Sequence, residues 1–290
     1  MITWFKNTIP ASVSYMFISA LGFALMAACV KSVSQHGIPV LEIVAARAIV
    51  SGLISYVVIK RKKISPWGNN KPLLIARGLV GVTALYFVYY SVTKLPLAEA
   101  TILQYLHPVF TALLALIFLK EIIQRSTITC ILLSMLGLLV MVSPNLYGET
   151  ITYSWLSVSA GVIGAFGSAV AYILVKKLTK TEDSSVIVFY FPFVSLPIAI
   201  VLLGNDFVFP SLMALGLLVL VGVFTQIGQI ALTKALHCDD ANKATAYSYV
   251  QVIFSLLIGW FLFNEAALLT TLAGGALILI GAMINIFWKR

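Results

Sequence analysis

Long apolar runs follow one another along almost the whole chain, separated by short polar connections. A helix needs roughly twenty residues to cross about 30 Å of hydrocarbon, and each run has about that length. The pattern predicts ten membrane-spanning helices, at residues 11–33, 38–59, 72–93, 97–119, 126–143, 154–175, 185–203, 209–233, 242–263 and 267–287. Turn-forming residues such as Gly68 and Pro144 stand in the connections. We therefore expect an all-α membrane protein.

The basic residues gather in alternate connections. If the amino terminus is cytoplasmic, the cytoplasmic segments hold Lys6, Lys60, Arg61, Lys62, Lys63, Lys71, Lys120, Arg125, Lys176, Lys177, Lys180, Lys234, Lys243, Lys289 and Arg290. The opposite side then keeps only Lys31 and Lys94. Because short loops rich in Lys and Arg stay in the cytoplasm, this distribution predicts ten spans with both termini cytoplasmic, in the inner (plasma) membrane.

The composition agrees with a membrane protein and argues against a soluble, nucleic-acid-binding or disulfide-rich protein. The chain is 61% hydrophobic and only 10% charged, whereas soluble proteins are about 45–50% apolar and about 25% charged, so much of its surface must face lipid. The net charge of +9 sits in loops between apolar runs, which indicates membrane anchoring and no nucleic-acid partner. Cys29, Cys130 and Cys238 are scattered, so we expect no disulfide framework, metal or cofactor.

The chain repeats itself. Residues 100–121 match residues 244–265 at one fixed offset, with Ala, Thr, Tyr, Phe, Leu and Glu recurring in order. The upstream helices add further matches at similar offsets, such as Gly22 with Gly167. The repeat divides the chain into residues 1–147, with helices 1–5, and residues 148–290, with helices 6–10.

The two halves are expected to be inverted. Each half contains five spans, an odd number, so the second half must enter the membrane upside down relative to the first. The charges agree, since Lys94 is expected outside and its counterpart Lys234 inside. Inverted repeats give a fold two related shapes, one open to each side of the membrane, which is the basis of alternating access. The repeat therefore favours a transporter over an enzyme.

Three stretches resemble a known family. They are the Ala-Arg-Gly of residues 76–78, the run from 95 to 121, and its echo ending at residues 263–265. Across essentially its whole length the chain resembles the EamA family of the drug/metabolite transporter superfamily. The resemblance implies ten helices, a central cavity lined mainly by helices 1–4 and 6–9, and peripheral helices 5 and 10. Family members move amino acids, S-adenosylmethionine, sugars and other metabolites.

Polar side chains form stripes on the predicted helices. Helix 4 carries Thr101, Gln104, His107 and Thr111 on one face, and helix 9 carries Thr245, Ser248, Gln251 and Ser255 at the equivalent positions. Helix 8 adds Gln226, Gln229 and Thr233, aligned with Tyr86, Tyr89 and Thr93 of helix 3. Polar groups inside hydrocarbon either face a water-filled cavity or form hydrogen bonds between helices. Both alternatives stay open for these stripes. The predicted substrate-binding residues are Gln104, His107, Thr111, Tyr86, Tyr89, Gln226, Gln229, Tyr247, Ser248 and Gln251.

Charged residues within the spans are candidates for coupling or gating. Glu42 and Arg47 lie five residues apart, so they point about 140° away from each other and do not pair within their helix. Arg47 needs a carboxylate, a carbonyl or a substrate anion from elsewhere, and a structural role fits it equally well. Glu42 either carries a proton or is solvated. Arg77 is expected to extend to the cytoplasmic surface.

The function predicted is a secondary transporter, an exporter or exchanger of amino acids or related zwitterionic or cationic compounds. One alternative is an importer or exchanger of S-adenosylmethionine or a nucleotide-like metabolite. Another is a membrane-embedded enzyme or lipid-handling protein, but no nucleophile, metal cluster or pair of acids supports it. The expected partners are the substrate and the bilayer, and the expected oligomeric state is a monomer or weak homodimer.

Overall fold

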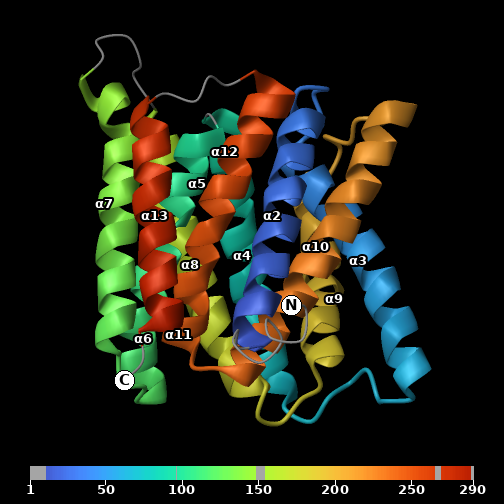
Figure 1. Ribbon diagram of the computed structural model, residues 1–290. Helices are drawn as coiled ribbons and strands as arrows, with labels where there is room; N and C mark the ends of the chain where they lie inside the picture. The colour runs from blue at the N-terminus through green and yellow to red at the C-terminus, as the bar shows by residue number, and fades with distance from the viewer. Residues whose placement is uncertain (1–10, 96, 148–153, 265–268, 289–290) are drawn as a thin grey trace, which may run out of the picture.

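The computed structural model describes residues 11–95, 97–147, 154–264 and 269–288, and the regular elements in these ranges are all helical. The first half contains α2 (Ala11–Ser34), α3 (Val40–Lys62), α4 (Lys71–Lys94), α5 (Leu97–Gln104), α6 (His107–Leu114), the π-helical η1 (Ala115–Leu119) and α7 (Arg125–Tyr147). The second half contains α8 (Trp155–Leu178), α9 (Ser184–Leu203), α10 (Leu212–Cys238), α11 (Ala241–Ala246), the 3₁₀ turn η2 (Tyr247–Tyr249), α12 (Val250–Phe263) and α13 (Leu269–Phe287). These helices form one upright bundle (Figure 1).

Most of the long helices are suited to a bilayer. In the described ranges, seven are long and apolar enough to cross a membrane: α2, α3, α4, α8, α9, α10 and the stretch Lys243–Phe263. Three shorter apolar stretches cover His107–Leu119, Arg125–Val140 and Leu272–Asn285. Large apolar side chains such as Val201 and Leu262 lie exposed on the outside of the bundle, which a lipid-facing surface requires. The predicted all-helical class is confirmed.

The helices pair in a symmetric way. α2 packs against α10 and α4 against α8, while α3 packs against α9 and α7 against α13. If α2 corresponds to α8 and α4 to α10, exchanging the halves converts the first pair into the second and leaves the other two unchanged. Figure 1 shows the halves running in opposite directions: α5 lies above α6, whereas α12 lies above α11.

The helices predicted at residues 97–119 and 242–263 are each broken near the middle. The first divides at Tyr105, between α5 and α6, and the second passes through η2. Pro108 lies in the first turn of α6, where its missing N–H and fixed φ favour a new helix start. The second half has Val252 at the equivalent position, and its break is only a 3₁₀ turn.

Close backbone contact holds the halves together. A Cβ atom added to Gly22 of α2 would lie 3.0 Å from the amide nitrogen of Gly228 and 3.1 Å from the carbonyl oxygen of Phe224, both on α10. The lack of a side chain at this position lets the two helix backbones approach closely, as is common where membrane helices pack without a hydrophobic driving force.

Polar contacts join the helix ends where most basic residues lie. Lys62 Nζ lies 2.9 Å from an oxygen of Asp183, and Glu182 Oε1 accepts hydrogen bonds from the amides of Asn69 (2.7 Å) and Asn70 (2.6 Å). Partial burial raises the pKa of the Asp183 carboxyl, but hydrogen bonds from Lys62 and from the Ser185 amide together lower it by more, so this pKa lies below its ordinary value. These contacts tie the α3–α4 connection to the α8–α9 connection.

Candidate functional site

A cavity of about 70 Å³ lies inside the bundle, between helices of both halves. Its polar lining residues are Ser19, Arg47, Arg77, Gln104, His107, Ser168, Tyr172, Gln229, Ser248 and Gln251. Its apolar lining residues are Met16, Ala20, Phe23, Met26, Gly81, Ala84, Leu85, Val88, Ala171, Phe191 and Leu232. An apolar wall with a few convergent polar groups is the usual construction of a small-molecule site.

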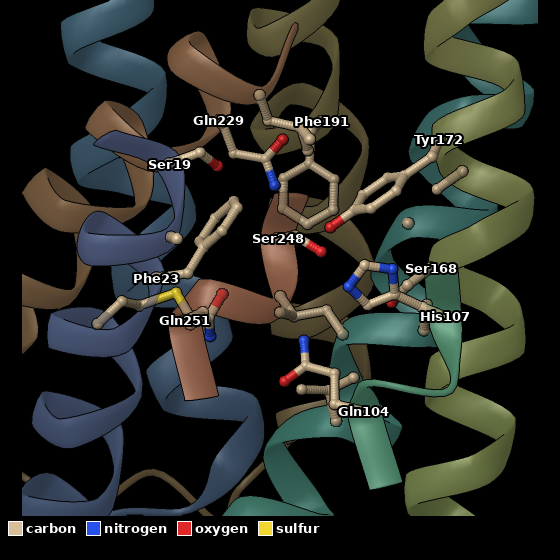
Figure 2. A pocket seen from close by; sticks show the side chains of 18 of the residues that line it. Ser19, Phe23, Gln104, His107, Ser168, Tyr172, Phe191, Gln229, Ser248 and Gln251 are labelled. Atoms are coloured by element: carbon tan, nitrogen blue, oxygen red, sulfur yellow. The ribbon is translucent and has the colours of Figure 1, made fainter. Parts of the chain in front are cut away.

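Two equivalent pairs of side chains face the cavity from the broken helices. Gln104 and Ser248 occupy the same position in the two repeats, and so do His107 and Gln251. Figure 2 shows these four side chains projecting into the pocket from opposite sides. Broken helices that present polar groups near mid-membrane are a recurrent arrangement in secondary transporters.

Two arginines lie on one part of the cavity wall. Arg47 on α3 and Arg77 on α4 are only 2% and 4% exposed, and their guanidinium carbons lie 4.8 Å and 4.9 Å from the centre of the Phe191 ring. Arg77 Nη2 also donates a hydrogen bond of 3.1 Å to Gln229 Oε1. The expectation that Arg77 extends to the cytoplasmic surface is therefore wrong. Gly81, one turn further along α4, gives the reason, because a Cβ atom there would lie 2.8 Å from Arg77 Nη1.

Much of the hydrogen-bonding capacity of these arginines is unused. The Nε and Nη1 atoms of both side chains are buried without a hydrogen-bond partner, and neither arginine forms an ion pair with a carboxylate in the described part of the chain. His107 Nδ1 is also buried and unpaired, while its ring packs 5.1 Å from the ring of Tyr172. The cavity thus presents donors that protein groups do not satisfy.

The comparison with known proteins decides the family. The model of the EamA-like transporter family matches residues 11–143 and 155–287, one match for each half. The chain belongs to the EamA-like transporter family. The resemblance noted from the sequence is confirmed, and the protein is a membrane transporter rather than an enzyme.

Individual relatives of this EamA transporter have different named activities. The chain is similar to the pseudopaline exporter of Pseudomonas aeruginosa, with 31% identity over 278 residues that cover 96% of each protein. It is also similar to the S-adenosylmethionine uptake transporter of Rickettsia bellii, with 28% identity over 77% of this chain and 75% of that protein. A solved crystal structure matches 94% of this chain and 95% of its own with a TM-score of 0.80 at 16% identity, which shows the fold alone.

Two predicted site residues of the EamA transporter, both tyrosines of α4, lie off the cavity. Tyr86 is 37% exposed, beside the rings of Phe87 and Tyr90, because it is about 200° round the helix from the lining residue Ala84. Tyr89 is buried behind the lining, and its hydroxyl donates to Met26 Sδ over 3.3 Å.

Three further predicted residues are buried between helices instead of lining the cavity. Gln226 Nε2 donates to Ser55 Oγ over 2.7 Å and so links α10 to α3. Thr111 and Tyr247 are fully buried, Tyr247 among apolar side chains. For these residues the packing alternative fits better than substrate contact.

Glu42 also lies away from the cavity. It is in the first turn of α3, and its Oε2 accepts a hydrogen bond of 3.0 Å from the amide of Val208. It therefore joins α3 to the connection between α9 and α10 at the end of the bundle opposite the Lys62–Asp183 pair. Within the described residues, no group of three His, Cys, Asp or Glu side chains is arranged to hold a metal ion.

Sequence reasoning missed several lining residues besides Arg77. Ser168 and Ala171 of α8 occupy the repeat positions of Phe23 and Met26 of α2, and all four line the cavity. The alignment of the two first helices therefore held a usable signal for this inward face. No comparable signal marks Phe191, whose ring enters the lining from α9.

Proposed function

We propose that this EamA transporter is a secondary transporter that moves small organic metabolites across the inner membrane by alternating access, as an exporter or exchanger. The observation that supports this most is the meeting of His107 and Gln251, equivalent residues of oppositely directed halves, at one cavity. A site on the pseudo-symmetry axis remains in contact with both halves while one half rocks against the other.

We propose ten membrane spans with both termini cytoplasmic. Seven long and three shorter apolar helical stretches in the described residues agree with that number. The ends of α2 and α13 near the termini lie at the same end of the bundle (Figure 1). That end also has the helix ends with Lys62 and Lys176, which the positive-inside rule assigns to the cytoplasm. We expect a monomer or a weak homodimer.

The size of the cavity supports a cycle with more than one state. At about 70 Å³ it is far below the roughly 300–1,000 Å³ of sites that bury a metabolite. The helices must separate before a substrate enters. The contacts at the two ends, Lys62 with Asp183 and Glu42 with Val208, are the ones that such an opening would break in turn.

The proposed substrate-contacting residues are Gln104, His107, Gln229, Ser248 and Gln251, together with Arg47. Among the described lining residues, His107 is the only one whose free side chain titrates near neutral pH, and none is a carboxylate. This favours exchange or downhill movement over coupling to a proton gradient.

A transport assay that surveys many metabolites at once tests the proposal. Purified protein is reconstituted into vesicles loaded with an isotope-labelled extract of bacterial metabolites, and the compounds that leave are identified by mass spectrometry. We expect a small set of compounds to leave faster than from protein-free vesicles. His107→Ala and Gln251→Ala should slow their release about tenfold or more, with melting temperatures near that of the unmodified protein. If no compound leaves faster than from protein-free vesicles, the chain does not transport small metabolites in this way.

A further inference from the structure

We propose that Arg47 and Arg77 together bind the carboxylate groups of the transported compound, so that the substrate is a small organic acid with net negative charge. This inference rests on the proposed function, since it names the class of molecule that the same cavity accepts. It differs from the zwitterionic or cationic substrate expected from the sequence.

The first argument is electrostatic. A guanidinium stays protonated in proteins, so the cavity wall has two positive charges that are almost completely shielded from water. Ionised side chains at such depth normally pair with an opposite charge or face a polar pathway. Both arginines line the cavity and have no carboxylate partner among the described residues. An anion in the cavity supplies the missing charge.

The second argument is the geometry of the free donors. Arg77 uses Nη2 to bind Gln229 Oε1, while Nε and Nη1 of Arg77 and of Arg47 remain without partners. Nε–H and the Nη1 hydrogens point to different sides of the guanidinium, so each free nitrogen can donate its own charge-assisted hydrogen bond to a carboxylate oxygen. Gln229 fixes the orientation of one guanidinium and leaves its other nitrogens for a ligand.

The third argument is that three acids in the described part of the chain are already engaged at the two ends of the bundle. Glu42 accepts from the amide of Val208, and Asp183 pairs with Lys62. Glu121 accepts from the amide of Ala241. The Phe191 ring offers each guanidinium a cation–π contact, but an aromatic face provides only partial negative charge and no hydrogen-bond oxygen.

The two ends of the cavity differ in their chemistry. In Figure 2, Gln229 and Phe191, the partners of the arginines, lie at one end of the pocket and Gln104 at the other. His107 and Ser248 lie between them, and these residues are neutral hydrogen-bonding groups. The expected ligand therefore places its carboxylates at the Phe191 end and its amide, hydroxyl or other uncharged polar groups toward Gln104.

Thermal stability of the purified full-length protein tests this inference. The probes are the sodium salts of citrate, 2-oxoglutarate and L-glutamate, compared with L-glutamine and L-lysine at the same ionic strength. At least one acid should raise the melting temperature by about 3–6 °C at ten times its Kd, whereas glutamine and lysine should not. Arg47→Gln and Arg77→Gln should each abolish the shift. Arg125→Gln is the matched control, because Arg125 is exposed at the start of α7, and it should keep the shift.

Two milder variants distinguish a loss of acid binding from a loss of folding. Arg77→Lys keeps the positive charge but loses the several fixed N–H donors of the guanidinium, and Gly81→Ala displaces the Arg77 guanidinium without removing it. Each should weaken acid binding at least fivefold in a protein that still melts cooperatively.

Three results would overturn the inference: stabilisation by lysine and not by the acids, no stabilisation by any of the three acids, or an acid-induced shift that survives in Arg47→Gln and Arg77→Gln. The last would identify an adventitious salt effect. If the acids bind through the arginines but no metabolite leaves the vesicles of the transport assay, the proposed function fails and the anion site stands.

Discussion

Arg77 Nη2 donates to Gln229 Oε1 over 3.1 Å, and this hydrogen bond joins α4 of the first half to α10 of the second half beside the cavity. The two residues come from repeats that are expected to move relative to each other. The contact therefore belongs both to the binding site and to the interface between the moving parts.

Gln229→Glu should stabilise the folded protein and block transport. The new carboxylate would form a charge-assisted pair with Arg77, which we expect to contribute about 1–3 kcal/mol and to raise the melting temperature by several degrees. The same carboxylate would occupy the positive part of the cavity, so release of labelled metabolites should fall more than tenfold. Gln35→Glu adds the same charge at an exposed position and should change neither quantity. A variant that transports normally would show that Gln229 is remote from the pathway.

The topology can be tested with reporter fusions. Fusions after residue 65 and after the carboxyl terminus should report a cytoplasmic location, and a fusion after residue 147 should report an external one. The expectation follows from five spans in each half. A cytoplasmic signal after residue 147 would contradict the five-plus-five arrangement and the inversion of the repeats.

The Lys62–Asp183 pair should contribute to stability in a pH-dependent way. The pKa of Asp183 is lowered in the folded protein, so the contribution is complete above the ordinary pKa of about 3.8 and is lost as the pH falls through the lowered value. Asp183→Asn keeps an amino-terminal cap for α9 but removes the charge. Because both side chains are well exposed, the variant should lose less than about 1 kcal/mol, equally from pH 5 to pH 8.

Melting curves of the Asp183→Asn variant and the unmodified protein across this pH range check the prediction. The difference in melting temperature should shrink as the pH falls below about 3.8 and through the lowered pKa of the folded protein, because the carboxylate is then protonated in both folded and unfolded chains. A difference that grows toward low pH would have the wrong sign for this ion pair.

Gly22→Leu should destabilise the bundle strongly. A side chain at this position meets the backbone of α10, at Gly228 and Phe224, which cannot move aside as a flexible side chain can. We expect a loss of about 2 kcal/mol or more, seen as a lower melting temperature and a lower yield of folded protein. Gly216→Leu is the control, because a Cβ atom at Gly216 has no neighbour within 4 Å. Equal behaviour of the two variants would mean that the α2–α10 contact is loose.

The helices were predictable because each apolar run is long, and the inward stripe was predictable because polar groups recur at helical spacing in both repeats. Gln104, His107, Ser248 and Gln251 were all identified in this way. The break between α5 and α6 could be predicted from Pro108, which favours a helix start. The 3₁₀ turn η2 contains no proline, so its position could not be predicted in this way.

The placement of Arg77 could not be predicted from its own helix. Near the start of α4, a long side chain can extend toward the surface or turn inward. The choice depends on Gly81, which leaves room, and on Phe191 and Gln229, which come from other helices. The position of Tyr86 off the cavity was not predictable for a related reason, because aromatic residues suit both a cavity and a lipid-facing surface.

The pair formed by α7 and α13 stands apart from the cavity, since no described residue of either helix belongs to its lining. Gly137 of α7 makes this pairing tight, because a Cβ atom there would lie 2.5 Å from the carbonyl oxygen of Gly274 on α13. The two helices come from different halves, so we expect their tight contact to be the hinge about which the halves rock. A fluorophore on the exposed face of α7, for example at Leu136, would provide a stationary reference point. Single-molecule distances from it to a second dye on α3 would record the opening of each side in turn.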